Sequence, residues 1–434
     1  MSRAFFLSVI LFFSVANQGF AQVKVYPAIT PASSPEAVGF SSERLKRIDT
    51  MLQGYVDRQR VNGMVGLLIR DGKIVYHKSL GYDDIDAKTP MKKDAIFRIA
   101  SQTKAITSVA AMILYEEGKF NLDDPISNYI PEFKNPKVLD KFNMEDTTWT
   151  TVPARREITF RDLMTHTSGI GYAQIGSPTA NVIYHKLGVF LEIGSGKLLL
   201  ADQMKKLATA PLLHQPGERF TYGLNSDLLG YLIEVISGMS LDQFFRTRIF
   251  EPLGMKDTYF YLPKEKQNRL VTLYSEDPTT KKVVKTPPVT KIAADNFYSD
   301  YPNSDGTMYS GGGGLSSTIM DYAIFLQMML NGGEYNGKRI LSPSTVRMMT
   351  TDQVSAFDRG TNNFGLGFGL VSEKASALAP WNAGSYNWGG MFATTYWVDP
   401  EAKLVALIYR NVYPTSLDRI VDQFRIMTYS AMTR

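Results

Sequence analysis

The pattern of apolar and polar positions predicts a helix and then a hairpin near the start of the chain. Apolar residues recur at helical spacing over 45–56, and Ser41 or Ser42 is placed to cap this helix. Two β-prone runs follow at 64–70 and 73–79. They are separated by Asp-Gly, which is typical of a two-residue hairpin turn.

The same pattern recurs near the far end of the chain. Apolar runs at 394–398 and Leu404–Tyr409 flank a short polar turn, and a final helix is expected around 416–427. We expect the two hairpins to join in one antiparallel sheet, covered by the first helix, the last helix and the helix that starts at Ser101. The predicted fold class is therefore α/β in the α+β sense, an antiparallel sheet flanked by helices.

The helix that starts at Ser101 carries candidate chemistry. Apolar residues at 106, 109, 110 and 113 give it one buried face, and Gly118 is placed to end it. Ser101 and Lys104 are three residues apart, so their side chains share a face. A serine hydroxyl is a weak nucleophile until a base takes its proton, and a lysine is a base only when its neutral form is favoured. The helix N-terminus favours negative charge that develops beside it.

Ser-x-x-Lys is weak as a motif when taken alone. At average residue usage it arises about once or twice by chance in a chain of this length. The alternative is a capping serine followed by a surface lysine.

The middle of the chain, about 135–310, has a different pattern. Polar loops separate short helical patterns, which we expect to form an inserted, mostly helical subdomain. Residues 263–309 are predicted to be a long irregular connection of the kind that often covers a site. The predicted helices are Phe160–Met164, 198–208, 227–237 and 241–249.

Composition excludes several classes of function. The 434 residues carry a net charge of +5 with both signs interspersed, so no nucleic-acid surface is expected. The chain has no cysteine, which excludes disulfides, thiolate catalysis and zinc–thiolate sites. Its four histidines lack metal-ligand spacing, so no metal or cofactor is expected.

The first 21 residues resemble a secretory signal. A basic start precedes a short apolar run and a small-residue cleavage site ending at Ala21. The run is short of the roughly 20 residues that span a bilayer, although an uncleaved anchor is the alternative. We expect residues 22–434 to form one exported domain, periplasmic or secreted, without stable membrane insertion.

Several phrases resemble one superfamily, the serine β-lactamases and penicillin-binding proteins, on the class C β-lactamase side. Ser-x-x-Lys is one of the motifs of this superfamily. The similar phrases lie at 97–104, 126–131, 159–169, 216–222, 251–255 and 311–317. The resemblance implies the β-lactamase/transpeptidase-like fold.

The resemblance also implies three elements around one cleft. The first is Ser101 with Lys104, and the second is Tyr222, which would share a proton with Lys104 and then protonate the leaving group. The third is a segment on a sheet strand, aligned here with Trp388, Gly389 and Gly390. The N–H groups of Ser101 and of the next residue, Met391, would form the oxyanion hole.

Departures from the lactamase pattern favour a neutral substrate. Leu224 stands where Tyr-x-Asn places asparagine, with Asn225 one place later and Asp227 beyond it. Trp388 replaces the cationic or hydroxyl residue that commonly holds a β-lactam carboxylate in this superfamily. Arg410 would restore such a contact if it faced the cleft; the alternative is a solvent-facing residue at a strand end.

Tyr-x-Leu-x-x-Asp together with Trp-Gly-Gly looks like the family VIII carboxylesterases. We therefore predict an exported serine hydrolase that acts through an acyl-enzyme on carboxylic esters, with a small-molecule acyl substrate and no cofactor. One alternative is a β-lactamase or D-alanyl-D-alanine carboxypeptidase. Another, of a different class, is a catalytically inactive binding protein with the same fold. His166, in a His-Thr-Ser-Gly phrase, is interpreted as part of a structural turn rather than as a triad base.

Overall fold

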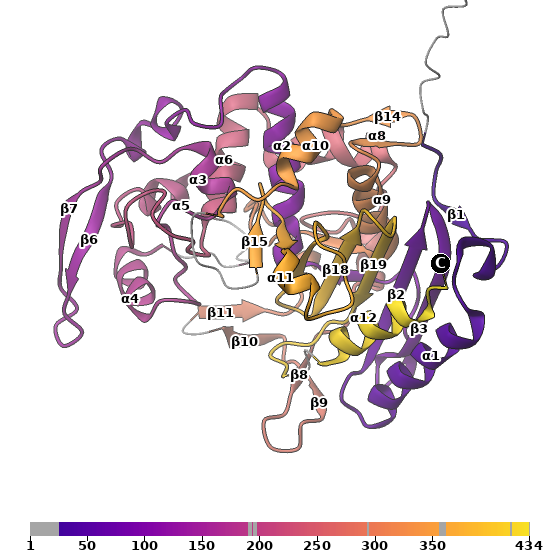
Figure 1. Ribbon diagram of the computed structural model, residues 1–434. Helices are drawn as coiled ribbons and strands as arrows, with labels where there is room; N and C mark the ends of the chain where they lie inside the picture. The colour runs from indigo at the N-terminus through magenta and orange to yellow at the C-terminus, as the bar shows by residue number, and fades with distance from the viewer. Residues whose placement is uncertain are drawn as a thin grey trace, which may run out of the picture.

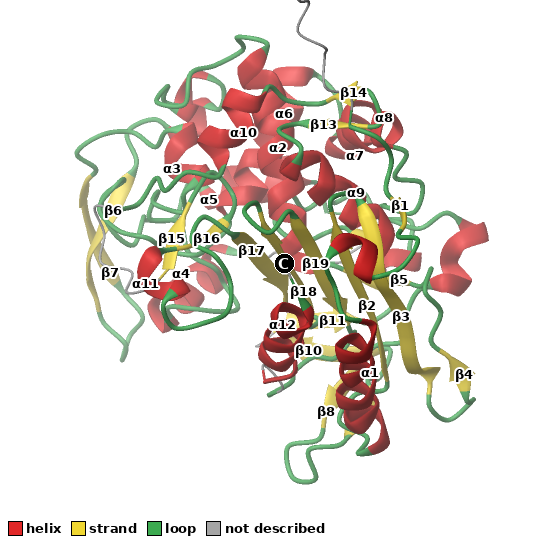
Figure 2. Ribbon diagram, turned by 45° about the vertical axis from the view of Figure 1, so that its right-hand side comes forward, coloured by secondary structure: helices red, strands yellow, loops and turns green. Residues whose placement is uncertain are grey.

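A computed structural model describes residues 26–189, 193, 198–292, 295–355, 362–416 and 419–433. The predicted signal at 1–21 lies outside these residues. Figure 1 shows the fold along the chain, and Figure 2 shows its strands and helices from a second side.

A large sheet lies at the centre of the fold, in the strand order β1-β3-β2-β19-β18-β17-β16-β15, with β4 paired to β3. Strands β2 and β19 pair antiparallel, so the predicted union of the two terminal hairpins is confirmed. The Asp71-Gly72 turn has φ of 50° and 71°, as a two-residue hairpin turn requires. The strands are β1 (Thr30–Pro31), β2 (Gly63–Arg70), β3 (Lys73–Asp84), β4 (Thr89–Pro90), β15 (Asn362–Phe364), β16 (Gly369–Val371), β17 (Tyr386–Gly390), β18 (Thr394–Asp399) and β19 (Leu404–Tyr409).

The central strand β19 is apolar throughout because both faces of the sheet are buried there. On β19, Val405 and Leu407 belong to one core, while Leu404 and Ala406 belong to the other. This alternation follows from the two-residue period of a strand. The sheet is therefore the middle layer of the molecule.

Helices α1 (Ser42–Asp57) and α12 (Arg419–Ala431) pack together on one face of the sheet, in front of the strands in Figure 2. Ser41 caps α1 by accepting a hydrogen bond from the Arg44 N–H at 3.3 Å, as predicted. On the other face, α9 (Ile319–Leu330) contacts β2 and β19 directly. The position of α9 was not predicted from the sequence.

The helix that carries the candidate nucleophile is α2 (Thr103–Glu116), preceded by a 3-10 turn over Ala100–Gln102. The predicted single buried face is wrong, because every residue of α2 from Thr103 to Leu114 is buried. Helix α6 (Asn225–Ser237) packs against α2 and helps to enclose it. A short ladder of β5 (Ile96–Arg98) with β12 (Ser316–Thr318) leads into the 3-10 turn.

The region from 135 to 310 contains helices and short strand pairs. Its helices are α3 (Phe160–Met164), α4 (Pro178–Leu187), α5 (Leu200–Leu207), α6, α7 (Leu241–Phe245) and α8 (Glu251–Leu253). Its hairpins are β6 (Lys137–Phe142) with β7 (Trp149–Pro153), which protrudes at the left of Figure 1, β8 (Tyr274–Glu276) with β9 (Val283–Lys285), and β10 (Val289–Ile292) with β11 (Asp295–Tyr298). The connection 263–309 is thus less irregular than predicted, because its β-prone runs find partners within the same segment.

The remaining short elements pack around this frame: β13 (Glu334–Tyr335), β14 (Lys338–Arg339), α10 (Pro343–Met349) and α11 (Glu373–Ser376). Within the described ranges, no single helix has the length and apolarity of a membrane span. The bent pair formed by Asn225–Ser237 and Leu241–Leu253 meets that test only when its two parts are taken together.

Candidate active site

The chain reaches Ser101 through an unusual backbone conformation. Ala100 has φ of 43°, a left-handed value that residues with a Cβ rarely adopt. The backbone of Ile99 is held by the Leu315 carbonyl, which accepts a hydrogen bond from the Ile99 N–H at 3.1 Å. The 3-10 turn that follows presents Ser101, half-buried, at the head of α2.

The structure brings Ser101, Lys104 and Tyr222 together. Ser101 Oγ accepts hydrogen bonds from Lys104 Nζ at 3.2 Å and from the Tyr222 hydroxyl at 2.8 Å. Lys104 is only 3% exposed and also donates to the Gly312 carbonyl at 2.6 Å. Its Nζ lies 4.8 Å from the centre of the Tyr222 ring. These contacts are those that a hydroxyl nucleophile and its proton acceptors require.

Tyr222 is held by aromatic neighbours from three segments. Its ring centre lies 4.9 Å from that of His166, 5.4 Å from that of Tyr172 and 5.7 Å from that of Trp388. Burial raises the pKa of Tyr172 well above its usual value, and the charge of a Tyr222 phenolate would raise it further. Tyr172 is therefore a neutral phenol beside the candidate base.

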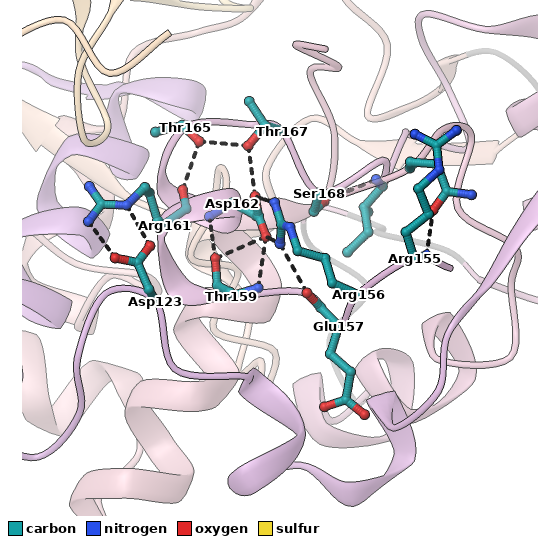
Figure 3. Close-up of polar contacts among 12 residues, drawn as sticks. Asp123, Arg155, Arg156, Glu157, Thr159, Arg161, Asp162, Thr165, Thr167 and Ser168 are labelled. Atoms are coloured by element: carbon teal, nitrogen blue, oxygen red, sulfur yellow. Dashed lines mark hydrogen bonds and ion pairs between the residues drawn. The ribbon is translucent and has the colours of Figure 1, made fainter. Parts of the chain in front are cut away.

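The His166 turn is anchored by a polar network that Figure 3 draws. Asp162 accepts hydrogen bonds from Arg156 at 2.5 and 2.8 Å and from the Thr167 hydroxyl at 3.1 Å. Asp162 also forms a reciprocal capping pair with Thr159 at the start of α3. Since His166 is 2% exposed and packs against Tyr222 with its ring tilted by 46°, the network fixes one wall of the site, in agreement with the interpretation of this phrase as a structural turn.

Asn225, whose role the sequence left open, ties that turn to α6. Its amide nitrogen lies 3.0 Å from His166 Nδ1, and its carbonyl oxygen accepts from the Ser168 hydroxyl at 2.5 Å. Asn225 is fully buried and does not line the cavity at Ser101. Asn225 therefore supports the His166 wall of the site without lining the cavity.

Asp227 lies in the site itself. It is 1% exposed, lines the cavity, and accepts hydrogen bonds from Ser310 Oγ at 2.5 Å and from the Gly312 N–H at 3.0 Å. Burial raises the pKa of Asp227, while the charge of Lys104 and these hydrogen bonds act in the opposite direction. The carboxyl group and the lysine are thus close enough to influence each other.

The residues of the third predicted segment, Trp388 to Gly390 with the following Met391, differ in their positions relative to the cavity. Met391 lines the cavity, whereas Trp388 packs on Tyr222 and on Phe364, whose ring centre is 5.4 Å away. A Cβ at Gly390 would lie 2.3 Å from the Ile99 carbonyl oxygen, but one at Gly389 would lie no closer than 3.3 Å to any neighbour. Gly390 is therefore needed for the approach of β17 to the nucleophile turn, rather than for the approach of a substrate.

A cavity of about 180 Å³ opens at Ser101. Its lining is mostly apolar or aromatic and includes Phe297 of β11, so the 263–309 connection contributes to the site as predicted. No arginine or lysine is among the described residues that line it. The described lining residues are Ala100, Ser101, Tyr172, Gln174, Ile175, Ile193, Tyr222, Asp227, Asn296, Phe297, Ser310, Gly312, Gly313, Met391 and Tyr413.

Arg410 lies in neither of the two positions expected from the sequence, which were facing the cleft and facing solvent. It is 2% exposed, and its Nε donates to the Ala393 carbonyl at 3.3 Å. It is therefore neither solvent-facing nor part of the cavity lining. Over the described parts of the chain, no group of three or more histidine, aspartate or glutamate side chains is arranged to hold a metal ion.

Some residues of the site were not predicted. Gly312 falls within one of the recognised phrases, but the pattern gave no reason to expect that its carbonyl accepts from Lys104. Tyr172, Phe297 and Tyr413 come from loops and a short strand, where hydrophobic periodicity carries no information on facing. Only the fold brings them to Ser101.

Known proteins are similar to this chain over most of its length. The family model described as beta-lactamase matches residues 48–428. Protein Rv1367c of Mycobacterium tuberculosis is 35% identical over 81% of this chain and 86% of its own length. Esterase EstB of Burkholderia gladioli is 28% identical over 88% of this chain and 94% of its own length.

Among solved structures, EstCE1, titled a hydrolase with promiscuous acyltransferase activity, superposes with a TM-score of 0.75. It is 26% identical and covers 89% of this chain and 98% of its own. The matched range includes the nucleophile turn, the tyrosine loop and strand β17. The chain belongs to the β-lactamase family of serine hydrolases and has the β-lactamase/transpeptidase-like fold.

Proposed function

We propose that the protein is a serine hydrolase that cleaves carboxylic esters through an acyl-enzyme. The observation that carries the proposal is the pair of hydrogen bonds that Ser101 Oγ receives from Lys104 and Tyr222, at 3.2 and 2.8 Å. Oγ attacks the ester carbonyl while its proton passes to the Lys104–Tyr222 pair. The bond from the acyl carbon to the alcohol then breaks, and the departing alkoxide takes the proton. Water repeats the sequence on the acyl-enzyme and releases the acid.

The carbonyl oxygen becomes negative in the tetrahedral intermediate and requires donors. In this proposal the N–H groups of Ser101 and Met391 supply them, since Met391 lines the cavity directly after β17. Gly390 allows β17 to lie against the Ile99 backbone, close to Ser101.

Esters are favoured over β-lactams by the charges of the cavity. A β-lactam or a D-alanyl peptide carries a carboxylate, and the described lining offers no arginine or lysine to hold it. Asp227 places an acidic group there instead. The apolar lining suits a neutral acyl group.

The proposal is tested with p-nitrophenyl esters, nitrocefin and a fluorophosphonate probe. Ser101→Ala should abolish ester turnover and labelling. The conservative variant Ser108→Ala, on the same helix and away from the cavity lining, should keep both. Nitrocefin turnover far above ester turnover would favour the β-lactam alternative, and failure of the probe to label Ser101 would favour a catalytically inactive protein.

Export of residues 22–434 is proposed as well, from the apolar run at the start of the chain. Expression of the full sequence in a bacterial host, fractionation, and mass measurement of the mature N-terminus test it. A cytoplasmic chain that retains Met1 would contradict it.

A further inference from the structure

Asp227 is a buried acidic group that the proposed reaction does not yet use. Its Oδ1 accepts from Ser310 Oγ and from the Gly312 N–H, while Oδ2 has no hydrogen-bond partner among the described residues. A Cβ at position 312 would lie 2.2 Å from Oδ2, so only glycine fits against this carboxyl group. Such an arrangement costs stability, because a buried polar atom without a partner is unfavourable.

The same turn holds the lysine. The Gly312 N–H donates to Asp227, and the Gly312 carbonyl accepts from Lys104 Nζ at 2.6 Å. The next residue back is also fixed, because the Gly311 carbonyl accepts from the Thr107 hydroxyl at 2.6 Å. One peptide turn therefore links the carboxyl group on α6 to the amine on α2.

We propose that Asp227 is a positioning residue: it holds the turn of Gly312 against Lys104 and stabilises the positive charge that Lys104 acquires with the Ser101 proton. The inference rests on the proposed function, because it needs Lys104 to take up that proton. The logic is that of any base oriented by a third group, in which an acid fixes the base and stabilises the cation formed during attack.

The pH dependence of the rate distinguishes this positioning role of Asp227 from a purely structural one. A nearby negative charge favours the protonated form of the base, so its removal moves the acidic limb of the pH–rate profile to lower pH. It also lowers the plateau, because the cation formed during attack loses its stabilisation. The titratable groups that interact with Asp227 in the described structure are Lys104 of α2 and Tyr172, which in turn interacts with Tyr222.

The test follows the rate at which a fluorophosphonate labels Ser101 in the full-length protein, by intact mass, as a function of pH. Asp227→Asn should lower the plateau roughly tenfold and move the acidic limb down by about one pH unit, the shift that corresponds to a tenfold change. Ser310→Ala keeps the carboxyl group, so it should lower the plateau less and leave the limb in place. Asp399→Asn removes a buried acid that is hydrogen-bonded to Asn382 and Tyr429, outside the cavity lining, and should change neither.

The outcomes separate this inference from the proposed function. A wild-type protein that resists the probe would overturn both. A wild type that is labelled, with Asp227→Asn showing an unmoved acidic limb, would overturn the inference alone, whatever the plateau. If Asp227→Asn does not fold, Ser310→Ala decides: a labelling rate equal to that of the wild type would show that the contact to Asp227 does not position Lys104.

Discussion

The two glycines of β17 offer a matched test of how the site is built. In Gly390→Ala the new Cβ would lie 2.3 Å from the Ile99 carbonyl oxygen and 2.5 Å from Thr394 Oγ1. The first of these is backbone, so it has no rotamer to change, and β17 must move away from the nucleophile turn. In Gly389→Ala the nearest atom is 3.3 Å away, which a small adjustment relieves.

The expected effects on stability and on catalysis differ in size. Overpacking of this kind costs about 1–3 kcal/mol. With an unfolding entropy of about 2.1 cal/mol/K per residue over 434 residues, that cost lowers Tm by only about 1–3 °C. A displacement of reacting groups by about 1 Å can lower the rate about 100-fold. Gly390→Ala should therefore be a folded protein with very weak activity.

The assay compares kcat/KM for a short p-nitrophenyl ester with Tm in the wild type and both variants. Gly389→Ala should stay within about threefold of the wild type, with a nearly unchanged Tm, because a shift of a few tenths of an ångström relieves its 3.3 Å contact to the Thr394 carbonyl oxygen. Full activity in Gly390→Ala would refute the reasoning. So would an equal loss in both variants, because the argument depends on their different distances to backbone atoms.

Three other predictions follow from the same structure. Tyr222→Phe keeps the ring contacts to His166 and Trp388 but removes the hydroxyl that lies 2.8 Å from Ser101 Oγ. The value of kcat/KM should therefore fall by about 100-fold or more, while Tm stays unchanged. The control is Tyr129→Phe, which loses only a hydroxyl hydrogen-bonded to the Lys119 carbonyl. Asn225→Ala removes the hydrogen bonds that the buried Ser168 and His166 make with Asn225, so thermal melting should show a loss of about 1–3 kcal/mol, and an unchanged Tm would contradict the role of this wall. Burial raises the pKa of Asp321 to about 6, so between about pH 4 and 6 the folded protein keeps a proton that the unfolded chain loses. Stability therefore falls as pH rises through that window. Asp321→Asn should remove this part of the dependence of Tm on pH, and a variant that keeps the wild-type dependence would contradict the prediction.

The hairpins illustrate which parts of the fold could be predicted. The Asp71-Gly72 turn and the polar turn before Leu404 each join runs that are adjacent in the chain, so local pattern identified both pairs of strands. Their union through β2 and β19 was also predicted and is confirmed, although the period of the apolar residues does not by itself show which hairpins pair. The burial of α2 on every side was not predicted, since it depends on α6 and α7, which pack there from distant parts of the chain.

For the site, the sequence alone identified the candidate catalytic residues. Ser-x-x-Lys, the tyrosine phrase and the glycine pair are short motifs, and the recognised phrases around them identified Ser101, Lys104 and Tyr222, which the structure brings within hydrogen-bonding distance.

Only the tertiary structure decided what surrounds these groups. It placed the Gly312 carbonyl on Lys104, Asp227 beside it, Arg410 away from the cavity, and Phe297 and Tyr413 in the lining of the cavity. The physical reason is that a motif reports contacts between neighbours in the chain. The lining of a cavity, in contrast, depends on how segments hundreds of residues apart pack, and side-chain periodicity does not encode that packing.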